Sequence, residues 1–306
     1  MNWFLIALVA PFVWGIVNIG DHYLISKYSD TTKERSSGGL VLFPSMIAVF
    51  VVFFIMIFNN GIFNISLNDK ILLMLSGALT IIWMVLYLYA LEIEDTSAIV
   101  PWFLTVPVFG FVLGYFFLGE TLNIKQLIGS IVVLIGVALV SFNFFDKEKK
   151  TKRKPVFYML IACFILAVSG VIFKFVTVEG NFWVSSFWEY FGLGSTGFLI
   201  FLFIPKFRKE FMHMNRTGGR KIFFVNIVTE FLTIMANLVT NFALLLAPVA
   251  MVYLVGSFQP AIVLFLTIIG TKFLPHIIKE DISKKTLVPK IIAVVLMTIG
   301  SIILFL

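Results

Sequence analysis

Five polar or ionisable side chains recur at helical spacing within the apolar stretch 221–245. They are Asn226, Glu230, Thr233, Asn237 and Asn241. Steps of four, three, four and four residues keep them on one face of an α-helix. Glu230 lies about 13 Å along such a helix from Lys221, near the middle of a bilayer. This face is predicted to line a cavity, with Glu230 as the principal coupling or substrate-recognition group; interhelical hydrogen bonding is the alternative.

Two further ionisable residues fall inside neighbouring apolar stretches. Lys174 comes 19 residues into 155–177, and Glu189 comes seven residues into 182–204. Because a short turn joins these stretches, both side chains are expected at similar depth below the same membrane surface. Pairing would lower the cost of burying either charge. We therefore expect an ion pair or a coupling site, with a purely structural pair as the alternative.

Four more residues are candidates for the wall of the same cavity. They are Trp14, Asn18, Trp102 and Gln259. Nearby prolines break helices and expose carbonyl groups that can hold a substrate; these are Pro101, Pro107 and Pro260. A tryptophan ring can bind an ammonium ion by a cation–π interaction, and packing at the membrane interface is the alternative.

A membrane-embedded helical bundle must position these residues. The 306-residue chain is 60% hydrophobic and only 13% charged, with a mean hydropathy of +1.05. A soluble protein needs a more charged surface, so the solvent is lipid. A soluble enzyme and a nucleic-acid binder are excluded, despite a net charge of +7. Cys163 and three scattered histidines provide no disulfide or metal-site pattern, and we expect no enzyme activity, cofactor or metal.

Ten stretches are long and apolar enough to cross a bilayer, which predicts an all-α integral membrane protein. They are 3–23, 38–58, 70–91, 96–118, 123–144, 155–177, 182–204, 221–245, 249–272 and 287–306. The first is expected to be a retained span, because no cleavage site follows it. Ala247-Pro248 is predicted to form a tight corner, because proline interrupts the helix.

Positive charges are distributed very unequally between the two sides. Of the 23 Lys and Arg, 20 fall in alternate connections, counted from the first. The positive-inside rule therefore places these connections in the cytoplasm and both termini outside. We expect a multi-pass protein of the plasma membrane, whose partners are the lipid bilayer and a small-molecule substrate, and which is a monomer or weak homodimer.

The two halves of the chain resemble each other. Tyr89-Ala90-Leu91 aligns with Phe242-Ala243-Leu244 at a shift of 153 residues, and Pro107 aligns with Pro260 at the same shift. We expect a first repeat at 1–145, a basic linker at 146–154 and a second repeat at 155–306. Five spans in each half require the second to be inverted, which is a transporter architecture.

Several motifs resemble the EamA-type drug/metabolite transporter superfamily. They are Trp14-Gly15-x-x-Asn18, Phe117-Leu118-Gly119-Glu120-x-Leu122, Gln126-Leu-Ile-Gly129 and Ile135-Gly136. The resemblance implies ten helices, a central cavity lined by helices 1, 3, 4, 6, 8 and 9, and alternating access. Members export amino acids and drugs or carry other metabolites. This chain departs from the pattern at His22, where the family often has Lys, and lacks the second Gly-Glu motif within 270–286.

The expected function is transport of a small polar or amphiphilic metabolite, with export of amino acids or amines as one form of it. A flippase for a lipid-linked group and a non-transporting membrane subunit are the alternatives. The sequence contains no nucleotide-binding motif, so uphill transport would need an ion gradient or a counter-substrate.

Overall fold

The computed structural model describes residues 2–29, 40–93, 99–141, 153–217, 219–259, 261–263, 265–266 and 284–305. The described residues form helices and turns, with no strand among them. The helices are α1 (Asn2–Ser29), α2 (Leu42–Phe58), α3 (Leu67–Ile93), η1 (Val100–Thr105), α5 (Val106–Leu118), α6 (Ile124–Ser141), α7 (Arg153–Thr177), α8 (Phe182–Phe203), α9 (Pro205–Thr217), α10 (Gly219–Leu246), α11 (Val249–Gly256) and α13 (Lys284–Phe305). The expected all-α fold is confirmed.

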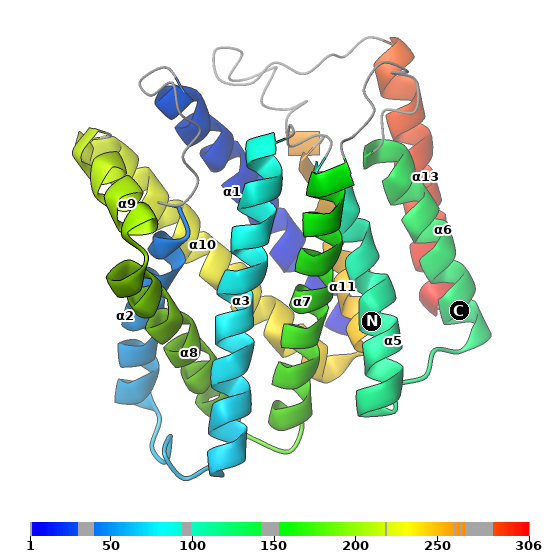
Figure 1. Ribbon diagram of the computed structural model, residues 1–306. Helices are drawn as coiled ribbons and strands as arrows, with labels where there is room; N and C mark the ends of the chain where they lie inside the picture. Colours follow the sequence, from blue (N-terminus) through cyan, green and yellow to red (C-terminus); the bar gives the residue numbers. More distant parts are fainter. Residues whose placement is uncertain are drawn as a thin grey trace.

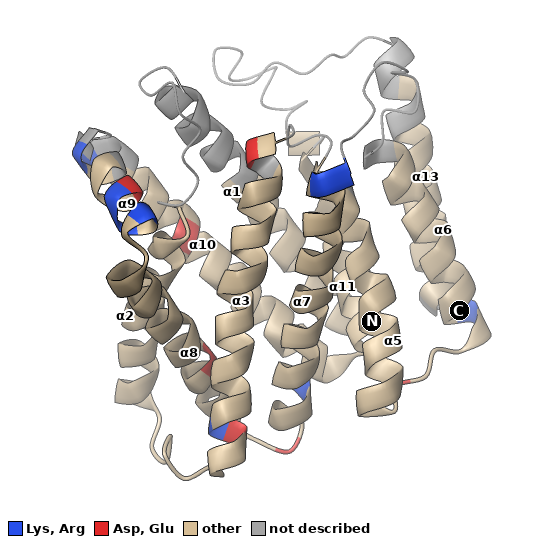
Figure 2. Ribbon diagram, in the orientation of Figure 1, with Lys and Arg blue, Asp and Glu red and all other residues tan. Residues whose placement is uncertain are grey.

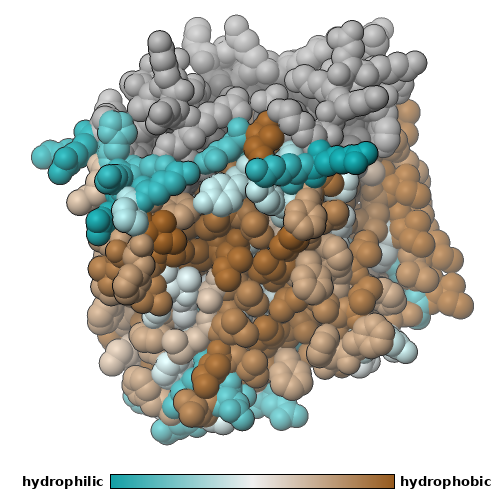
Figure 3. All heavy atoms as spheres, viewed as in Figure 1, coloured by the Kyte–Doolittle hydropathy of each residue, from teal (hydrophilic) through white to brown (hydrophobic). Residues whose placement is uncertain are grey.

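Length and composition suit several of these helices to a membrane. Among the described residues, three helical segments are each long enough and apolar enough to cross a membrane, namely Leu67–Ala90, Arg153–Thr177 and Phe223–Leu246. Six shorter apolar helices accompany them. Large apolar side chains such as Phe50, Phe53 and Ile57 of α2 are exposed, as expected for surfaces that face lipid. Figure 3 shows an apolar belt between two hydrophilic ends.

Two segments differ from the helices expected from the sequence. The span expected at 96–118 includes a 3₁₀ helix, η1, before α5, because Pro101 and Pro107 each occupy the first turn of a new helix. The charged connection after Phe203 is a helix, α9, which begins at Pro205 and is bent by 96° from α8. The expected linker 146–154 lies outside the described residues except for 153–154, which begin α7.

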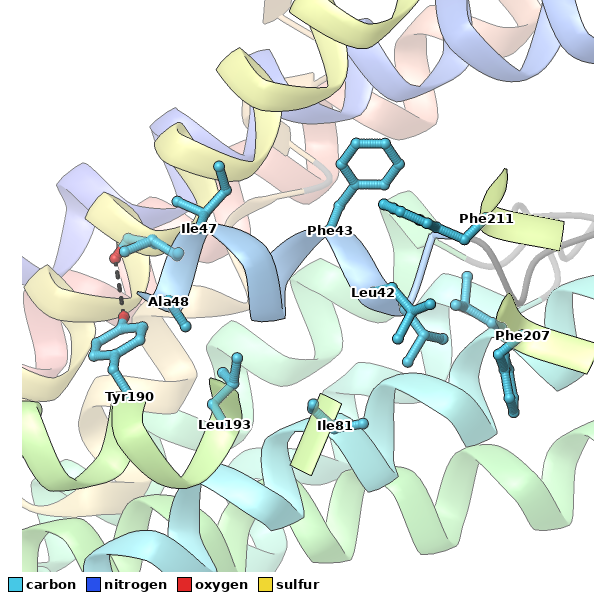
Figure 4. Packing of buried hydrophobic residues seen from close by; sticks show 12 residues of the cluster. Leu42, Phe43, Ile47, Ala48, Ile81, Tyr190, Leu193, Phe207 and Phe211 are labelled. Carbon is cyan, nitrogen blue, oxygen red and sulfur yellow. Dashed lines mark hydrogen bonds between the residues drawn. The ribbon is translucent and has the colours of Figure 1, made fainter. Parts of the chain in front are cut away.

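The helices form an upright bundle in which distant parts of the chain pack together (Figure 1). The most extensive packing joins α6 to α13, α3 to α7 and α8, α1 to α10, and α2 to α8. One apolar core cluster fills the junction of α2, α3, α8 and α9, with Phe43 of α2 packed against Phe211 of α9 at 5.1 Å between ring centroids. Figure 4 shows this cluster and the hydrogen bond from the Tyr190 hydroxyl to the Ile234 carbonyl, 3.3 Å long.

Basic residues that the structure describes are more numerous at one end of the bundle than at the other (Figure 2). Figure 2 shows Lys and Arg on α9 and at the start of α7. The α7–α8 turn and the α10–α11 corner lie at the other end, toward which both chain termini also lie (Figure 1). We call these the basic end and the opposite end.

Candidate functional site

Glu189 of α8 is a buried carboxylate at the junction of several helices. Glu189 is only 6% exposed. The Ser76 hydroxyl of α3 donates to Glu189 Oε1 at 2.8 Å, and Asn241 Nδ2 of α10 donates to Oε2 at 2.6 Å. Ion pairs among the described residues do not include Glu189, so a carboxyl group is held within the bundle by neutral donors alone. In a low-dielectric interior such a group is costly, which makes Glu189 a candidate functional residue.

Ser76 also connects α3 to α7. Its Oγ lies 2.9 Å from Ser169 Oγ and 3.1 Å from the Ser169 carbonyl oxygen, and the Ser169 hydroxyl lies 3.1 Å from the Ser76 carbonyl oxygen. Thr80, one turn along α3, lies 3.4 Å from Ser169 Oγ. We call Ser76, Ser169, Glu189 and Asn241 the polar centre; it joins one helix of the first half to three of the second.

Lys174 pairs with Glu120 and not with Glu189, so the expected Lys174–Glu189 ion pair is wrong. Lys174 Nζ lies 2.6 Å from Glu120 Oε1, and the two side chains are 11% and 14% exposed. Glu120 follows α5, whose C-cap Gly119 has the left-handed φ of 64° that glycine adopts easily. The turn brings the carboxylate to the opposite end of the bundle, where Lys174 reaches it from the last turn of α7.

The same pair satisfies the backbone of the predicted Ala247-Pro248 corner. Lys174 Nζ donates to the Ala247 carbonyl at 2.7 Å, and the Val249 N–H donates to Glu120 Oε2 at 2.8 Å. Helix ends leave such groups without intrahelical partners, and a carboxylate at the N-terminus of α11 is also favoured by the helix dipole. Lys174 and Glu120 therefore fix the corner between α10 and α11.

A cavity of about 890 Å³ lies at the opposite end of the bundle. Its wall combines the Lys174–Glu120 pair with residues of the α7–α8 turn and the α10–α11 corner, and it includes Ser185. Ser185 precedes Glu189 by one turn of α8, a rise of about 6 Å. The cavity thus approaches the polar centre along α8.

The structure joins one member of the predicted α10 face to the polar centre. Asn241 contacts Glu189, whereas Thr233 donates at 2.9 Å to the Thr229 carbonyl of its own helix. Asn226 is buried, and Glu230 and Asn237 are half-buried. Glu230 and Asn241 are about 16 Å apart along the helix, so the face runs from the polar centre toward the basic end.

The other predicted residues fall at separate places. Trp14 is half-buried and lies near Gly256 of α11. Trp102 packs in an apolar cluster with Cys163, whose Sγ lies 3.4 Å from the Trp102 carbonyl. Gln259 is half-buried, just beyond α11. The structure does not describe the side chains of Asn18 and His22. Pro260 also lies outside the described residues, as does the region of the lost second Gly-Glu motif except residues 284–286.

Sequence reasoning missed Ser76, Ser169 and the role of Glu120. A usable signal was present in the Ser76-Gly77 and Ser169-Gly170 dipeptides, each within an apolar stretch. Small and hydroxyl-bearing residues allow membrane helices to approach closely and bond to each other. A Cβ atom added at Gly77 would collide with the Glu189 carbonyl oxygen, which shows how close α3 and α8 are here.

Comparisons with known proteins agree with this architecture. Residues 1–142 match the EamA-like transporter family. A WAT1-related chloroplast protein of Arabidopsis thaliana is 29% identical over 123 residues, which are 39% of this chain and 28% of that protein. The chain therefore matches less than a third of that relative's length. One solved crystal structure superposes with a TM-score of 0.71 over 99% of this chain and 96% of the other, at 12% identity, which shows a shared fold.

Proposed function

We propose that this chain is an EamA-type membrane transporter of the drug/metabolite transporter superfamily, because residues 1–142 match the EamA-like transporter family, and that it carries a small polar or amphiphilic metabolite by alternating access. The observation that carries this proposal is the polar centre. Ser76 comes from the first half and Ser169, Glu189 and Asn241 from the second, and their contacts lie inside a largely apolar bundle. A site shared by two halves can open to either side when the halves rock.

The packing of the helices supports two related halves. We propose that α7 and α10 correspond to α1 and α3. If the two halves exchanged places, α1 would take the position of α7 and α10 that of α3, so the α1–α10 contact would become the α7–α3 contact. The α6–α13 contact would remain a contact between the same two helices. All three contacts are extensive. This pairing is what an inverted repeat with a shared midplane site would give.

The cavity and the polar centre beyond its wall favour a small substrate with an amino group. The cavity of about 890 Å³ is in the range of small-molecule sites, and the Glu189 carboxylate, one turn of α8 beyond the wall residue Ser185, can accept hydrogen bonds from an ammonium group. We propose amino acids or amines as the substrate class. With the basic end in the cytoplasm, the cavity faces outward, and export would end with release from it.

Ligand-dependent thermal stabilisation of the purified protein tests this function. A ligand that binds only the folded state raises the melting temperature by mass action. We expect stabilisation by some members of a panel of amino acids and amines, and weaker stabilisation by the same ligands in Glu189→Gln. Stabilisation by lipid-linked compounds alone would favour a flippase, and none by any soluble metabolite would contradict the proposal.

A further inference from the structure

We propose that Glu189 exchanges a proton with cavity water during the transport cycle, and that the Ser76 hydroxyl adapts to both states of its carboxyl group. Proton exchange would couple substrate movement to a proton gradient. The coupling role rests on the proposed transport function, whereas proton exchange at Glu189 is argued from the contacts of the polar centre.

The first observation is that, among the described residues, no ion pair joins the Glu189 carboxylate to a cation. Glu189 is 6% exposed, and Lys174 of α7 is held by Glu120 at 2.6 Å. The segment Leu42–Phe58 that forms α2 contains no ionisable residue. An ionised carboxylate without a cation is costly in a membrane interior, so a proton is a means of neutralising it.

The other ionisable groups around α8 lie at a distance or belong to other contacts. Tyr190 bonds to the Ile234 carbonyl and Tyr253 to the Leu166 carbonyl; each is an electrostatic neighbour of Glu189. Other charged residues that the structure describes on these helices stand near helix ends, along α9 or further along α10; these are Asp69, Lys70 and Glu92 of α3, Arg153 and Lys154 of α7, Lys206, Arg208, Lys209, Glu210, His213 and Arg216 of α9, and Arg220 and Glu230 of α10.

The second observation is that the single hydrogen of the Ser76 hydroxyl has more than one acceptor within reach. Ser76 Oγ lies 2.8 Å from Glu189 Oε1 and 3.1 Å from the Ser169 carbonyl oxygen, besides its 2.9 Å contact with Ser169 Oγ. A hydroxyl group donates one hydrogen and accepts up to two. When Glu189 is ionised, Ser76 donates to the carboxylate. When Glu189 is protonated, its O–H donates to Ser76 Oγ, and the Ser76 hydrogen turns to the Ser169 carbonyl.

Asn241 fits both states without rotating. Its Nδ2 donates to Glu189 Oε2 at 2.6 Å, and Oε2 remains an acceptor whether or not Oε1 carries the proton. Each state therefore keeps the buried polar atoms of the carboxyl group hydrogen-bonded, and neither incurs the cost of an unsatisfied group. The contacts around Glu189 favour reversible titration over a permanently fixed charge.

Glu189 lies one helical turn beyond the wall of the cavity. Ser185 lines the cavity one turn of α8 before Glu189, about 6 Å along the axis. Uptake forms an O–H bond at Glu189 Oε1 with a proton from cavity water, and the negative charge is lost. Release breaks the same bond and returns the proton to water on the side to which the site is then open. No other reactant is needed.

Infrared difference spectroscopy of the protein in lipid tests the proposal without a substrate. We expect the C=O stretch of a protonated carboxylic acid to appear as the pH is lowered, and to be absent from Glu189→Gln. Glu210→Gln, which changes a glutamate of α9 at the basic end, should retain it. Ser76→Ala removes the hydrogen-bond partner and should shift the band, a readout that loss of packing alone would not produce. Glu189→Asp keeps a carboxyl group and should restore a band if Glu189→Gln folds poorly.

An identical band in wild type and Glu189→Gln would overturn the assignment, as would the absence of any titrating carboxyl band in wild type. Either result would leave the transport function open, because ligand stabilisation is measured separately. Conversely, failure of every metabolite to stabilise the protein would remove the transport function without changing the spectrum.

Discussion

Lys174 on α7 contacts Glu120 after α5 at 2.6 Å, and both side chains also bond to the backbone of the α10–α11 corner. The pair thereby joins the ends of four helices at one end of the bundle. Its two hydrogen bonds to the corner assign it a structural task, while the cavity that it lines gives it access to a ligand.

Replacing one member of the Lys174–Glu120 pair should destabilise the fold strongly, and replacing both together should destabilise it by less than the sum of the two single changes. Lys174→Met and Glu120→Gln should each lower the free energy of unfolding by roughly 3 kcal/mol, because each leaves one buried charge without its partner. The double variant should lose less than the sum of the two. Thermal unfolding in detergent measures the cycle. Lys206→Ala is the control, since the exposed Lys206 pairs with Glu210 only at 3.9 Å and such a pair contributes little. Additive losses would indicate that the two charges act independently.

Close packing of α3 against α8 makes a paired glycine experiment possible. A Cβ atom at Gly192 would collide with the Met74 backbone, whereas a Cβ atom at Gly194 would make an ordinary 3.7 Å contact with the Ser45 carbonyl oxygen. Gly192→Ala should therefore destabilise the fold by about 1–3 kcal/mol through overpacking. Gly194→Ala should be neutral or slightly stabilising, because alanine favours helix. Melting temperatures of the two variants decide the matter, and equal values would contradict the α3–α8 contact.

Glu230 is expected to act on the path between the polar centre and the basic end. Glu230→Gln should leave expression and fold intact but lower proton-linked flux or cationic-substrate binding tenfold or more, a change of about 1.4 kcal/mol. Leu296→Gln, which places a glutamine in α13 instead, serves as the control and should not lower the flux. Uptake into proteoliposomes with and without a pH gradient is the measurement. Unchanged flux and an unchanged gradient response would reduce Glu230 to a helix-packing role.

The expected orientation rests on the 20 of 23 basic residues assigned to one side. A reporter active only outside the cytoplasm should be active after Leu306 and inactive when inserted at Lys150. Cytoplasmic activity of the C-terminal fusion would reverse the expected orientation, and with it the proposed outward-facing cavity.

Much of the fold could be predicted from local pattern, because the length of an apolar helix is fixed by the membrane. The expected 182–204 and 221–245 match Phe182–Phe203 and Gly219–Leu246 closely. Helix α9 was missed because its charges resemble a loop, although Phe207 and Phe211 bury its apolar face.

Helical periodicity was enough to predict the part of the site that lies on one helix face. It could not predict the contacts between side chains of different helices. Asn241 was identified from its helix face. Depth alone could not choose between Glu120 and Glu189 as the partner of Lys174, because both approach the same end of the bundle. Ser76 and Ser169 are separated by 93 residues, and no local pattern records their contact.

The polar centre is proposed to bind what the protein transports. Counterflow of a stabilising amino acid or amine tests this in proteoliposomes containing wild type, Glu189→Gln or Gly194→Ala. We predict saturable counterflow in wild type and Gly194→Ala, and at least a tenfold loss in Glu189→Gln, equal to about 1.4 kcal/mol. Undiminished counterflow in a folded Glu189→Gln variant, or none above empty liposomes in wild type with any stabilising ligand, would contradict the account.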